Sequence, residues 1–383
     1  MKLPGLSRIR DQQREQAAQC EFCGAESSLI SQFLGVCLNC IRQNFEAVKP
    51  RLERAHRKAR ESFGLPPTPP HGPGFTCRIC VNECQIAEGE RSFCGARRVE
   101  NGKLLGPTAT KGNLSWYYDP LPTNCVADWV CPGGTGAGYP TFAHRRGPEY
   151  GYKNLAVFYQ ACSFDCLFCQ NWHFRRVATD EPQVTASELA ARADETTSCV
   201  CFFGGDPTPQ LPHAILVSRL ARERRRDHIL RICWETNGSM HPALLKQMLR
   251  LSLESGGCLK FDLKAWDERV HFALCGVSNR RTLENFKLAA SYIAQRPSPP
   301  LLVASTLLVP GYVDGEEVFH IARFISSLNP EIPYALLAFY PSFCLNLPTT
   351  SKRHAEEALA AARQAGLKNV RIGNQHLLRY EDY

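Results

Sequence analysis

Two short apolar runs, each followed directly by a loop of distinctive composition, decide the fold of this chain. They are L-A-V-F-Y before Q-A-C-S-F-D-C-L-F-C-Q-N-W at residues 155–172, and C-V-C-F-F before G-G-D-P-T-P at residues 199–209. Apolar runs of this length between loop residues are typical of buried strands. The pattern continues toward the C-terminus and predicts strands at 155–159, 199–203, 229–234, 259–263, 302–308 and 334–339.

Helical stretches alternate with these strands, and they are predicted at 186–193, 213–225, 242–251, 282–294, 315–328 and 352–365. Regular alternation of strands and helices predicts an α/β fold with a parallel sheet. A closed barrel of this kind has about eight strand–helix units. Because this chain supplies six, we predict a partial (β/α)6 TIM-like barrel whose chemistry is carried by the loops that follow the strands.

Composition limits the class of protein. The 383 residues carry a formal net charge of +8, are 44% hydrophobic and include 19 cysteines. No run approaches the roughly 18 apolar residues of a membrane span. Residues 1–19 lack the apolar core of a secretory signal. We therefore predict a cytoplasmic protein with no membrane partner, in which thiols bind metals instead of forming disulfides.

The first cysteine group consists of two C-x2-C pairs, Cys20 with Cys23 and Cys37 with Cys40. Two such pairs suit tetrahedral zinc, so we predict a structural zinc ribbon. A basic helix interrupted by Pro50 is predicted at 41–63, before a stiff linker at 65–75. No aromatic residues alternate with its charges as platforms for base stacking, so we expect a solvated surface, although the sequence does not exclude nucleic acid.

The second cysteine group could hold zinc, a single iron or an iron–sulfur cluster, because its spacing of two, three and nine residues does not choose among them. It consists of Cys77, Cys80, Cys84 and Cys94. Cys125 and Cys131 lie on a loop rich in Pro and Gly, where they could complete a metal site or be plain thiols. The remaining cysteines occur singly, and we expect them to pack as small apolar side chains: Cys199, Cys201, Cys233, Cys258, Cys275 and Cys344.

The third cysteine group, Cys162, Cys166 and Cys169, follows the first predicted strand of the barrel. A four-iron cluster needs four ligands, so three cysteines leave one iron open. With Phe168 before the last cysteine, the spacing resembles the signature of the radical S-adenosylmethionine (radical SAM) superfamily. The resemblance implies a [4Fe-4S] cluster that binds S-adenosylmethionine (SAM). An electron donor such as flavodoxin or ferredoxin would then drive cleavage of SAM to a 5′-deoxyadenosyl radical.

Motifs after the later strands extend this resemblance. The segment G-G-D-P-T-P (204–209) looks like the glycine-rich segment that receives the SAM amino group, and E-T-N-G (235–238) follows the next strand. D-L-K (262–264) with its continuation, and L-V-P-G-Y-V-D (308–314), are similar to pyruvate formate-lyase activating enzyme and its relatives. The C-x2-C-x3-C group before the barrel and I-P-Y-A-L-L-A-F (332–339) resemble the AmmeMemoRadiSam group.

The resemblance implies a set of residues that bind SAM: Phe168, Gly204, Gly205, Asp206, Glu235, Thr236, Asn237, Asp262 and Lys264. Lys264 would pair with the SAM carboxylate, while Asp262 and Glu235 would hold ribose, sulfonium-side groups or a monovalent cation. Two places depart from the glycyl-radical activases. Ser305 and Tyr340 stand where an arginine and a histidine are expected near SAM.

Four units are thus predicted. They are a zinc-ribbon-like segment with a basic helix at 1–63, a Cys-rich metal-binding unit at 76–150, a radical SAM partial barrel at 151–345, and a C-terminal helix and tail at 346–383. The predicted function is a radical SAM enzyme that abstracts hydrogen from an unidentified substrate and could activate a glycyl-radical or other partner protein. The alternative is a metal-stabilised module that binds RNA or protein, with a structural cluster. The complete cysteine loop and glycine pair favour the enzyme.

Overall fold

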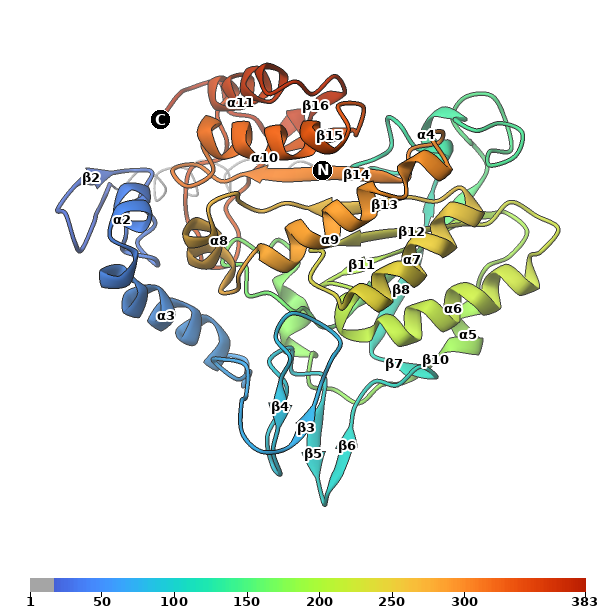
Figure 1. The fold of residues 1–383 in the computed structure, drawn as a ribbon, viewed down its shortest axis with the longest axis horizontal. Helices are drawn as coiled ribbons and strands as arrows, with labels where there is room; N and C mark the ends of the chain where they lie inside the picture. The colour runs from blue at the N-terminus through green and yellow to red at the C-terminus, as the bar shows by residue number, and fades with distance from the viewer. Residues whose placement is uncertain (1–16) are drawn as a thin grey trace, which may run out of the picture.

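A computed structural model describes residues 17–383, so most of the N-terminal segment in which no secretory signal is expected lies outside the described residues. Its largest feature is an eight-stranded sheet with the order β16-β15-β14-β13-β12-β11-β9-β8 (Figure 1). Seven of the strands are parallel, and β8 runs antiparallel to β9 at one edge. The predicted parallel α/β barrel is confirmed, and it is open at both edges.

The strands that were predicted from the sequence are present within a few residues of their expected bounds. They are β9 (Lys153–Tyr159), β11 (Thr197–Gly204), β12 (Arg231–Thr236), β13 (Leu259–Asp262), β14 (Leu302–Leu308) and β15 (Tyr334–Ala338). Two more strands extend the sheet beyond the six predicted units: β8 (Leu114–Pro120) and β16 (Val370–Gly373). Neither is a continuous buried apolar run, because each lies at an edge and exposes part of its length.

Helices cover the outer face of the barrel, as Figure 1 shows for the row from α6 to α10. They are α5 (Ala186–Ala190), α6 (Leu211–Arg224), α7 (Pro242–Ser255), α8 (Glu268–Cys275), α9 (Arg280–Ala290), α10 (Gly315–Leu328) and α11 (Lys352–Gln364). The helix α8 was not predicted. Its signals are local: the Asp267 side chain caps its first turn, and Gly276 ends it in the left-handed conformation.

The N-terminal segment packs against the barrel instead of standing apart from it. It contains β1 (Ala18–Gln19), β2 (Glu26–Ser27), α2 (Leu38–Gln43) and α3 (Phe45–Glu61). Its apolar residues, including Ile30, Leu34 and Val36, belong to the same buried cluster as the barrel strands. The prediction that Pro50 interrupts the helix is wrong, because the break falls at Asn44 and Pro50 lies inside α3. Burial of Val48 and Leu52 on either side offsets the hydrogen bond that proline cannot make.

The Cys-rich segment between the N-terminal helices and the barrel forms short hairpins. They pair β3 (Phe75–Thr76) with β4 (Gln85–Ile86) and β5 (Arg98–Glu100) with β6 (Lys103–Leu105). The strand β7 (Lys111–Gly112) pairs with β10 (Val184–Thr185), and the short helix α4 (Pro132–Thr135) precedes the barrel. Because β8 and β16 lie in the central sheet, the sheet crosses two of the predicted unit boundaries. No helix of the described residues is long and apolar enough to cross a membrane.

Candidate active site

All the residues predicted to bind the cluster and SAM line one cavity at the carboxyl ends of the strands. The cavity is bordered by Cys162, Cys166, Phe168, Cys169, Gly204, Gly205, Asp206, Glu235, Thr236, Asn237, Asp262 and Lys264. Its wall also includes residues that were not predicted, among them Gln170, Asn171, Phe174, Arg175, Leu307 and Leu337. Parallel strands end at the same edge of a barrel, so loops far apart in sequence meet there.

The three loop cysteines form an incomplete and widely spaced set of ligands. Cys166 is buried, and Cys162 and Cys169 are half-buried. Among residues 17–383, only the ribbon quartet places three or more ligand atoms within 4.8 Å of one another. Thiolates bound to different irons of a cluster lie further apart than thiolates that share one ion. The donor set therefore fits a cluster with one open iron better than a single metal ion.

The cysteine loop is anchored at its centre by Asp165, which is completely buried. The Asp165 carboxylate accepts hydrogen bonds from Arg175 at 2.5 Å and Arg60 at 3.4 Å, and it lies 2.8 Å from Nδ1 of His56. Burial alone would raise the pKa of Asp165, but the charge of Arg175 and the contacts with His56 and Arg60 hold this pKa below its usual value. The N-terminal helix α3 thus supplies two of the three groups that hold the cysteine loop.

Backbone hydrogen bonds tie the same loop to the helix α8 on its other side. The Asp165 and Leu167 amides each donate at 2.9 Å, to the carbonyls of Cys275 and Leu274 respectively. The Cys275 thiol lies 3.5 Å from the Cys166 sulfur. Cys275, which was expected to be an ordinary apolar residue, is therefore a direct neighbour of a predicted ligand.

The glycine-rich segment is shaped by its contact with the cysteine loop. The Gly205 amide donates to Tyr159 at 3.0 Å and the Asp206 amide donates to Ala161 at 2.8 Å, so these residues continue the pairing of β11 with β9. A Cβ on Gly205 would lie 2.3 Å from the Ala161 carbonyl oxygen. The sequence suggests that this glycine lets the backbone approach a ligand. In the structure the glycine is required by the adjacent cysteine loop itself.

Asp206 joins two loops of the site through its carboxylate. It accepts hydrogen bonds from the Thr208 amide at 2.7 Å, the Asn237 amide at 2.6 Å and the Thr236 hydroxyl at 3.1 Å. Burial raises the pKa of Asp206, and these hydrogen bonds oppose the rise. The carboxylate is thus directed at the E-T-N-G loop, although its residue lines the cavity.

Asn237 continues this network to the cysteine loop. Its side-chain amide donates to the Ser163 hydroxyl at 2.9 Å, and its backbone carbonyl accepts from Thr282 at 2.7 Å. The loops after β9, β11 and β12 are therefore joined side chain to side chain. Such a frame fixes the positions of the sulfur atoms before any cofactor is bound.

Two carboxylates of the cavity wall, Asp262 and Glu235, are each paired with a lysine. Lys264 contacts Asp262 at 2.5 Å and lies 5.6 Å from the centre of the Phe168 ring, and the Ser305 hydroxyl donates to Asp262 at 2.8 Å. Ser305 thus holds the carboxylate in the place where an arginine was expected. The other pair joins Glu235 to the buried Lys260 at 2.8 Å, a partner that the sequence motifs did not indicate.

The ribbon quartet is a compact set of four thiols that suits a single ion. The sulfur atoms of Cys20, Cys23, Cys37 and Cys40 all lie within 4.8 Å of one another. Gly24 between the pairs has φ of +74°, a value that L side chains rarely adopt, and it lets the chain turn beneath the thiols. The predicted metal-binding geometry of this quartet is present, and the identity of its metal stays a prediction.

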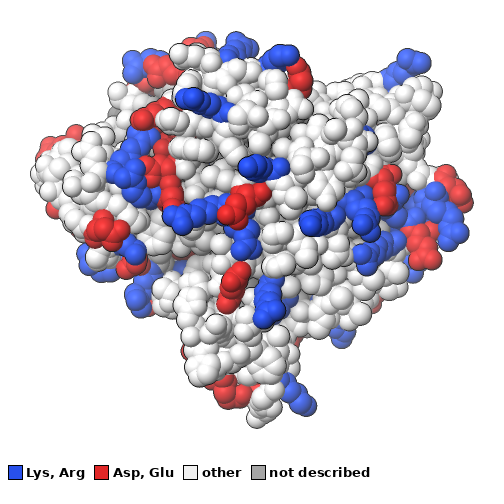
Figure 2. Space-filling view, in the orientation of Figure 1, with Lys and Arg blue, Asp and Glu red and all other residues white. Residues whose placement is uncertain are grey.

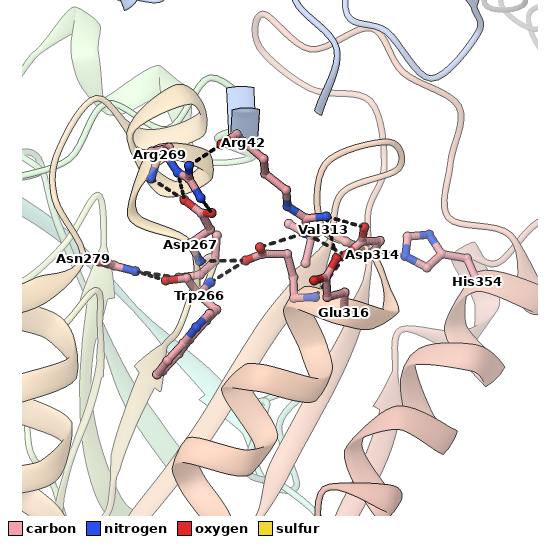
Figure 3. Close-up of polar contacts among 11 residues, drawn as sticks. Arg42, Trp266, Asp267, Arg269, Asn279, Val313, Asp314, Glu316 and His354 are labelled. Carbon is pink, nitrogen blue, oxygen red and sulfur yellow. Dashed lines mark hydrogen bonds and ion pairs between the residues drawn. The ribbon is translucent and has the colours of Figure 1, made fainter. Parts of the chain in front are cut away.

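Ion pairs fasten the ribbon to the barrel through Arg42 at the end of α2 (Figure 3). Its guanidinium contacts Asp314 at 3.1 Å, Glu316 at 2.9 Å and Glu317 at 2.9 Å, and Figure 3 shows it pointing toward the loop before α10. The Arg42 carbonyl accepts from Arg269 of α8. All three carboxylate partners follow β14, at the same end of the barrel as the candidate active site.

The L-V-P-G-Y-V-D motif serves this docking. The Tyr312 hydroxyl donates to the Val36 carbonyl at 2.9 Å and accepts from the Ser31 amide at 3.0 Å. A Cβ on Gly311 would lie 2.1 Å from the Leu29 carbonyl oxygen. The motif at residues 308–314, which resembles a segment of the activases, thus contacts the ribbon.

The second cysteine group lies against the cysteine loop of the barrel. The Asn82 side chain donates to the Ser163 carbonyl at 2.7 Å, and Cys94 packs on Ala161 beside Cys162. Unlike the ribbon quartet, this group has no three ligand atoms within 4.8 Å of one another among residues 17–383. In lacking a compact set of ligand atoms, it is like the cysteine loop of the barrel.

Comparison with known proteins supports the resemblance of the barrel and its cysteine loop to the radical SAM superfamily. Residues 156–325 match the family model of the Radical SAM superfamily. An uncharacterized protein of Methanocaldococcus jannaschii is 27% identical over 78% of this chain and 80% of its own length. The isethionate sulfite-lyase activating enzyme of Desulfovibrio desulfuricans is 33% identical over 43% of this chain and 49% of its own length. The pyruvate formate-lyase 1-activating enzyme of Escherichia coli K12 is 27% identical over 43% of this chain and 64% of its own length. The chain therefore spans only about half to two thirds of these activating enzymes.

Solved structures of related proteins align with part of the chain. A domain of pyruvate-formate lyase-activating enzyme from Bacteroides vulgatus aligns with 46% of this chain and 98% of its own, at 22% identity and a TM-score of 0.37. Streptococcus suis SuiB bound to S-adenosylmethionine aligns with 56% of this chain and 49% of its own, at 15% identity and a TM-score of 0.42. The matched family and the relatives named as activating enzymes indicate that this chain is an enzyme.

Proposed function

We propose that this chain, whose residues 156–325 match the family model of the Radical SAM superfamily, cleaves SAM reductively and uses the resulting radical to abstract hydrogen from a substrate. One observation carries the proposal. Every residue that the resemblance assigns to the cluster or to SAM lines the same cavity, although these residues come from four separate loops.

The chain's own residues divide into ligands, binding groups and supports. Cys162, Cys166 and Cys169 would hold a four-iron cluster, which supplies the electron for SAM cleavage when it is bound. Lys264 is a cation of the cavity wall and would bind the SAM carboxylate, in exchange for part of its contact with Asp262. Asp165 and Asp206 hold the loops in place, and in this scheme they touch neither the cluster nor SAM.

The substrate class that we propose is a partner protein, with installation of a glycyl radical as the leading case. The support is the naming of the relatives as activating enzymes of isethionate sulfite-lyase and pyruvate formate-lyase. A flavodoxin or ferredoxin would supply electrons. The second cysteine group lies beside the cysteine loop, where a cluster could pass electrons inward. We place the reaction in the cytoplasm.

Anaerobic reconstitution with iron and sulfide, followed by assay for 5′-deoxyadenosine, tests the proposal. The parent protein with dithionite and SAM should form 5′-deoxyadenosine, and a Cys162→Ala, Cys166→Ala, Cys169→Ala variant should form none. The matched control is Cys344→Ala, which removes a half-buried thiol outside the cavity. A triple variant that retained the iron, sulfide and SAM cleavage of the parent would refute the assignment.

The alternative function, a module that binds RNA through the basic helix, has less support. Of the basic residues of α3, Arg60 is buried on Asp165, and Arg51 pairs with Glu21 at 2.8 Å. Acidic and basic side chains also lie interspersed on the face shown in Figure 2. These residues are used for docking and for surface ion pairs.

A further inference from the structure

A second cavity of about 370 Å³ lies inside the barrel, nearer the amino ends of the strands than the candidate active site. Alternate residues of a strand face the same side of a sheet. The inward-facing residues of three neighbouring strands line this chamber, together with a loop before β9. They include Cys125, Cys131, Cys199, Cys201, Phe203, Arg231, Cys233, Glu235, Cys258 and Lys260.

Six of the 19 cysteines of the chain converge on this chamber. Four of them had been expected to pack singly as small apolar residues, and the roles of Cys125 and Cys131 were open. They instead line one cavity together. Apolar packing alone does not account for this set, because the charged groups of Lys260 and Arg231 lie among the thiols.

A buried cation lies against two of the chamber thiols. The Lys260 ammonium, in a side chain that is 3% exposed, donates to the sulfurs of Cys125 and Cys201 at 3.1 Å each and to Glu235 at 2.8 Å. Arg231 is already paired with the buried Glu149 at 2.6 Å. Lys260 therefore has one carboxylate and two sulfur atoms as partners, and an adjacent cation stabilises the thiolate form that binds metals.

The chamber thiols are not arranged as the compact ligand set of a single ion. Among residues 17–383, no three chamber sulfurs lie within 4.8 Å of one another, in contrast to the ribbon quartet. A single tetrahedral ion needs its ligands that close, whereas a cluster spreads them over several irons. A cluster held by four thiolates also carries net negative charge, for which Lys260 is the neighbouring cation.

We propose that this chamber binds a second iron–sulfur cluster, held by Cys125 of the loop, by Cys201 of β11 and Cys233 of β12, and by Cys258, which directly precedes β13. Glu235 and Phe203 line both the chamber and the candidate active site. A cluster in the chamber would therefore lie beside the space assigned to SAM. This site is independent of the cysteine loop and of the second cysteine group.

Metal analysis of the full chain tests the site. The starting protein is the Cys162→Ala, Cys166→Ala, Cys169→Ala variant, because it removes the signal of the loop cluster. Adding Cys201→Ala, Cys233→Ala and Cys258→Ala should remove iron and sulfide in equal amounts after anaerobic reconstitution with iron and sulfide, together with the matching Mössbauer signal. The matched control, Cys344→Ala in the same background, should lose neither.

Unchanged iron and sulfide after the chamber substitutions would overturn the proposal, and so would loss of zinc alone. If the multiple variant does not fold, Cys125→Ala is the second test, because this residue lies on a loop outside the sheet. It should shift the Mössbauer or electron paramagnetic resonance spectrum of the chamber cluster. An identical spectrum in a folded Cys125→Ala protein would also overturn the proposal. The radical SAM assignment is tested separately by 5′-deoxyadenosine formation.

Discussion

The ribbon quartet and the cysteine loop of the barrel use the same side chain in opposite ways. The ribbon gathers four sulfurs within 4.8 Å of one another, and one of them, Cys23, is exposed to solvent. The loop supplies three sulfurs that are spread around a cavity shared with a lysine and several carboxylates. A complete tetrahedral set leaves a metal no free position, whereas an incomplete set leaves a position for another ligand. The comparison separates a closed set of ligands from an open one.

The two sites are nevertheless mechanically connected. The segment that follows the ribbon carries His56 and Arg60 to Asp165, at the centre of the cysteine loop. Arg42, at the end of the preceding helix, fastens the ribbon to the loop before α10. The N-terminal segment that contains the ribbon therefore helps to hold the cysteine loop in place. The predictions below test how far the two sites depend on each other.

Removal of the ribbon metal should produce the largest effect on stability. We expect that Cys23→Ser with Cys37→Ser abolishes zinc binding and strongly lowers the free energy of unfolding, because a short segment without its metal cannot build a core. Any folded fraction should still cleave SAM. Metal analysis and thermal unfolding measure the first two effects, and 5′-deoxyadenosine formation measures the third.

Cys344→Ser is the matched control for that experiment, since it changes a half-buried thiol outside the quartet. If the ribbon quartet of the parent protein held iron and sulfide, the zinc assignment would be contradicted. Complete loss of SAM cleavage in well-folded protein would show that the two sites are not separable.

Asp165→Asn should give the next largest effect. Removing this carboxylate leaves Arg60 and Arg175, each 1% exposed, without their buried anion. Breaking a buried ion pair on one side costs about 3–5 kcal/mol, so the denaturation midpoint should fall clearly. The control is Asp227→Asn at an exposed position. Equal midpoints for the two variants would mean that Asp165 does not join the helix to the loop.

Lys264→Met should weaken SAM binding without loss of the cluster. Loss of one charge-assisted hydrogen bond costs about 1.5–3 kcal/mol, which corresponds to roughly a ten- to hundredfold rise in Kd. The measurement is a SAM titration of the reduced, reconstituted protein, with Lys246→Met on the exposed side of α7 as the control. Unchanged affinity would remove Lys264 from the SAM site while leaving the cluster assignment standing.

Arg42→Met should have the smallest effect. Glu317 loses its cation but keeps the amides of Trp266 and Asp267, at 2.6 Å and 3.1 Å. We therefore expect a loss of about 1–2 kcal/mol in the free energy of unfolding. Arg54→Met, on the exposed face of α3, is the control. A loss no larger than in this control would show that ribbon docking depends on Tyr312 and apolar contacts.

Much of the barrel could be read from the sequence because its signals are local. The strand β14 is buried along its whole length and was predicted at its observed bounds, and the ends of β11 and β15 differ by at most two residues. The edge strands β8 and β16 were missed, since half-exposed strands lack the continuous apolar run of a buried parallel strand. The break in the basic helix was misplaced because tertiary packing tolerated Pro50.

The candidate site divides in the same way. The spacing of Cys162, Cys166 and Cys169 and the composition of the following loops identified the cavity before any coordinates, because these ligands lie close together in sequence. Nothing in the sequence joined His56 to Asp165, 109 residues away, or Lys260 to Cys125, 135 residues away. Such pairs depend on how distant strands and loops meet.

The sequence by itself determined the parallel barrel, the place of the three-cysteine loop and the compact ribbon quartet, because periodicity and short ligand spacings are properties of neighbouring residues. Only the tertiary structure decided that the ribbon supports the cysteine loop, that Asp206 joins two loops, and that scattered cysteines share one chamber. The contacts of a buried side chain depend on which other residues pack around it. Its neighbours are fixed only when the strands assemble into the sheet and the N-terminal segment docks.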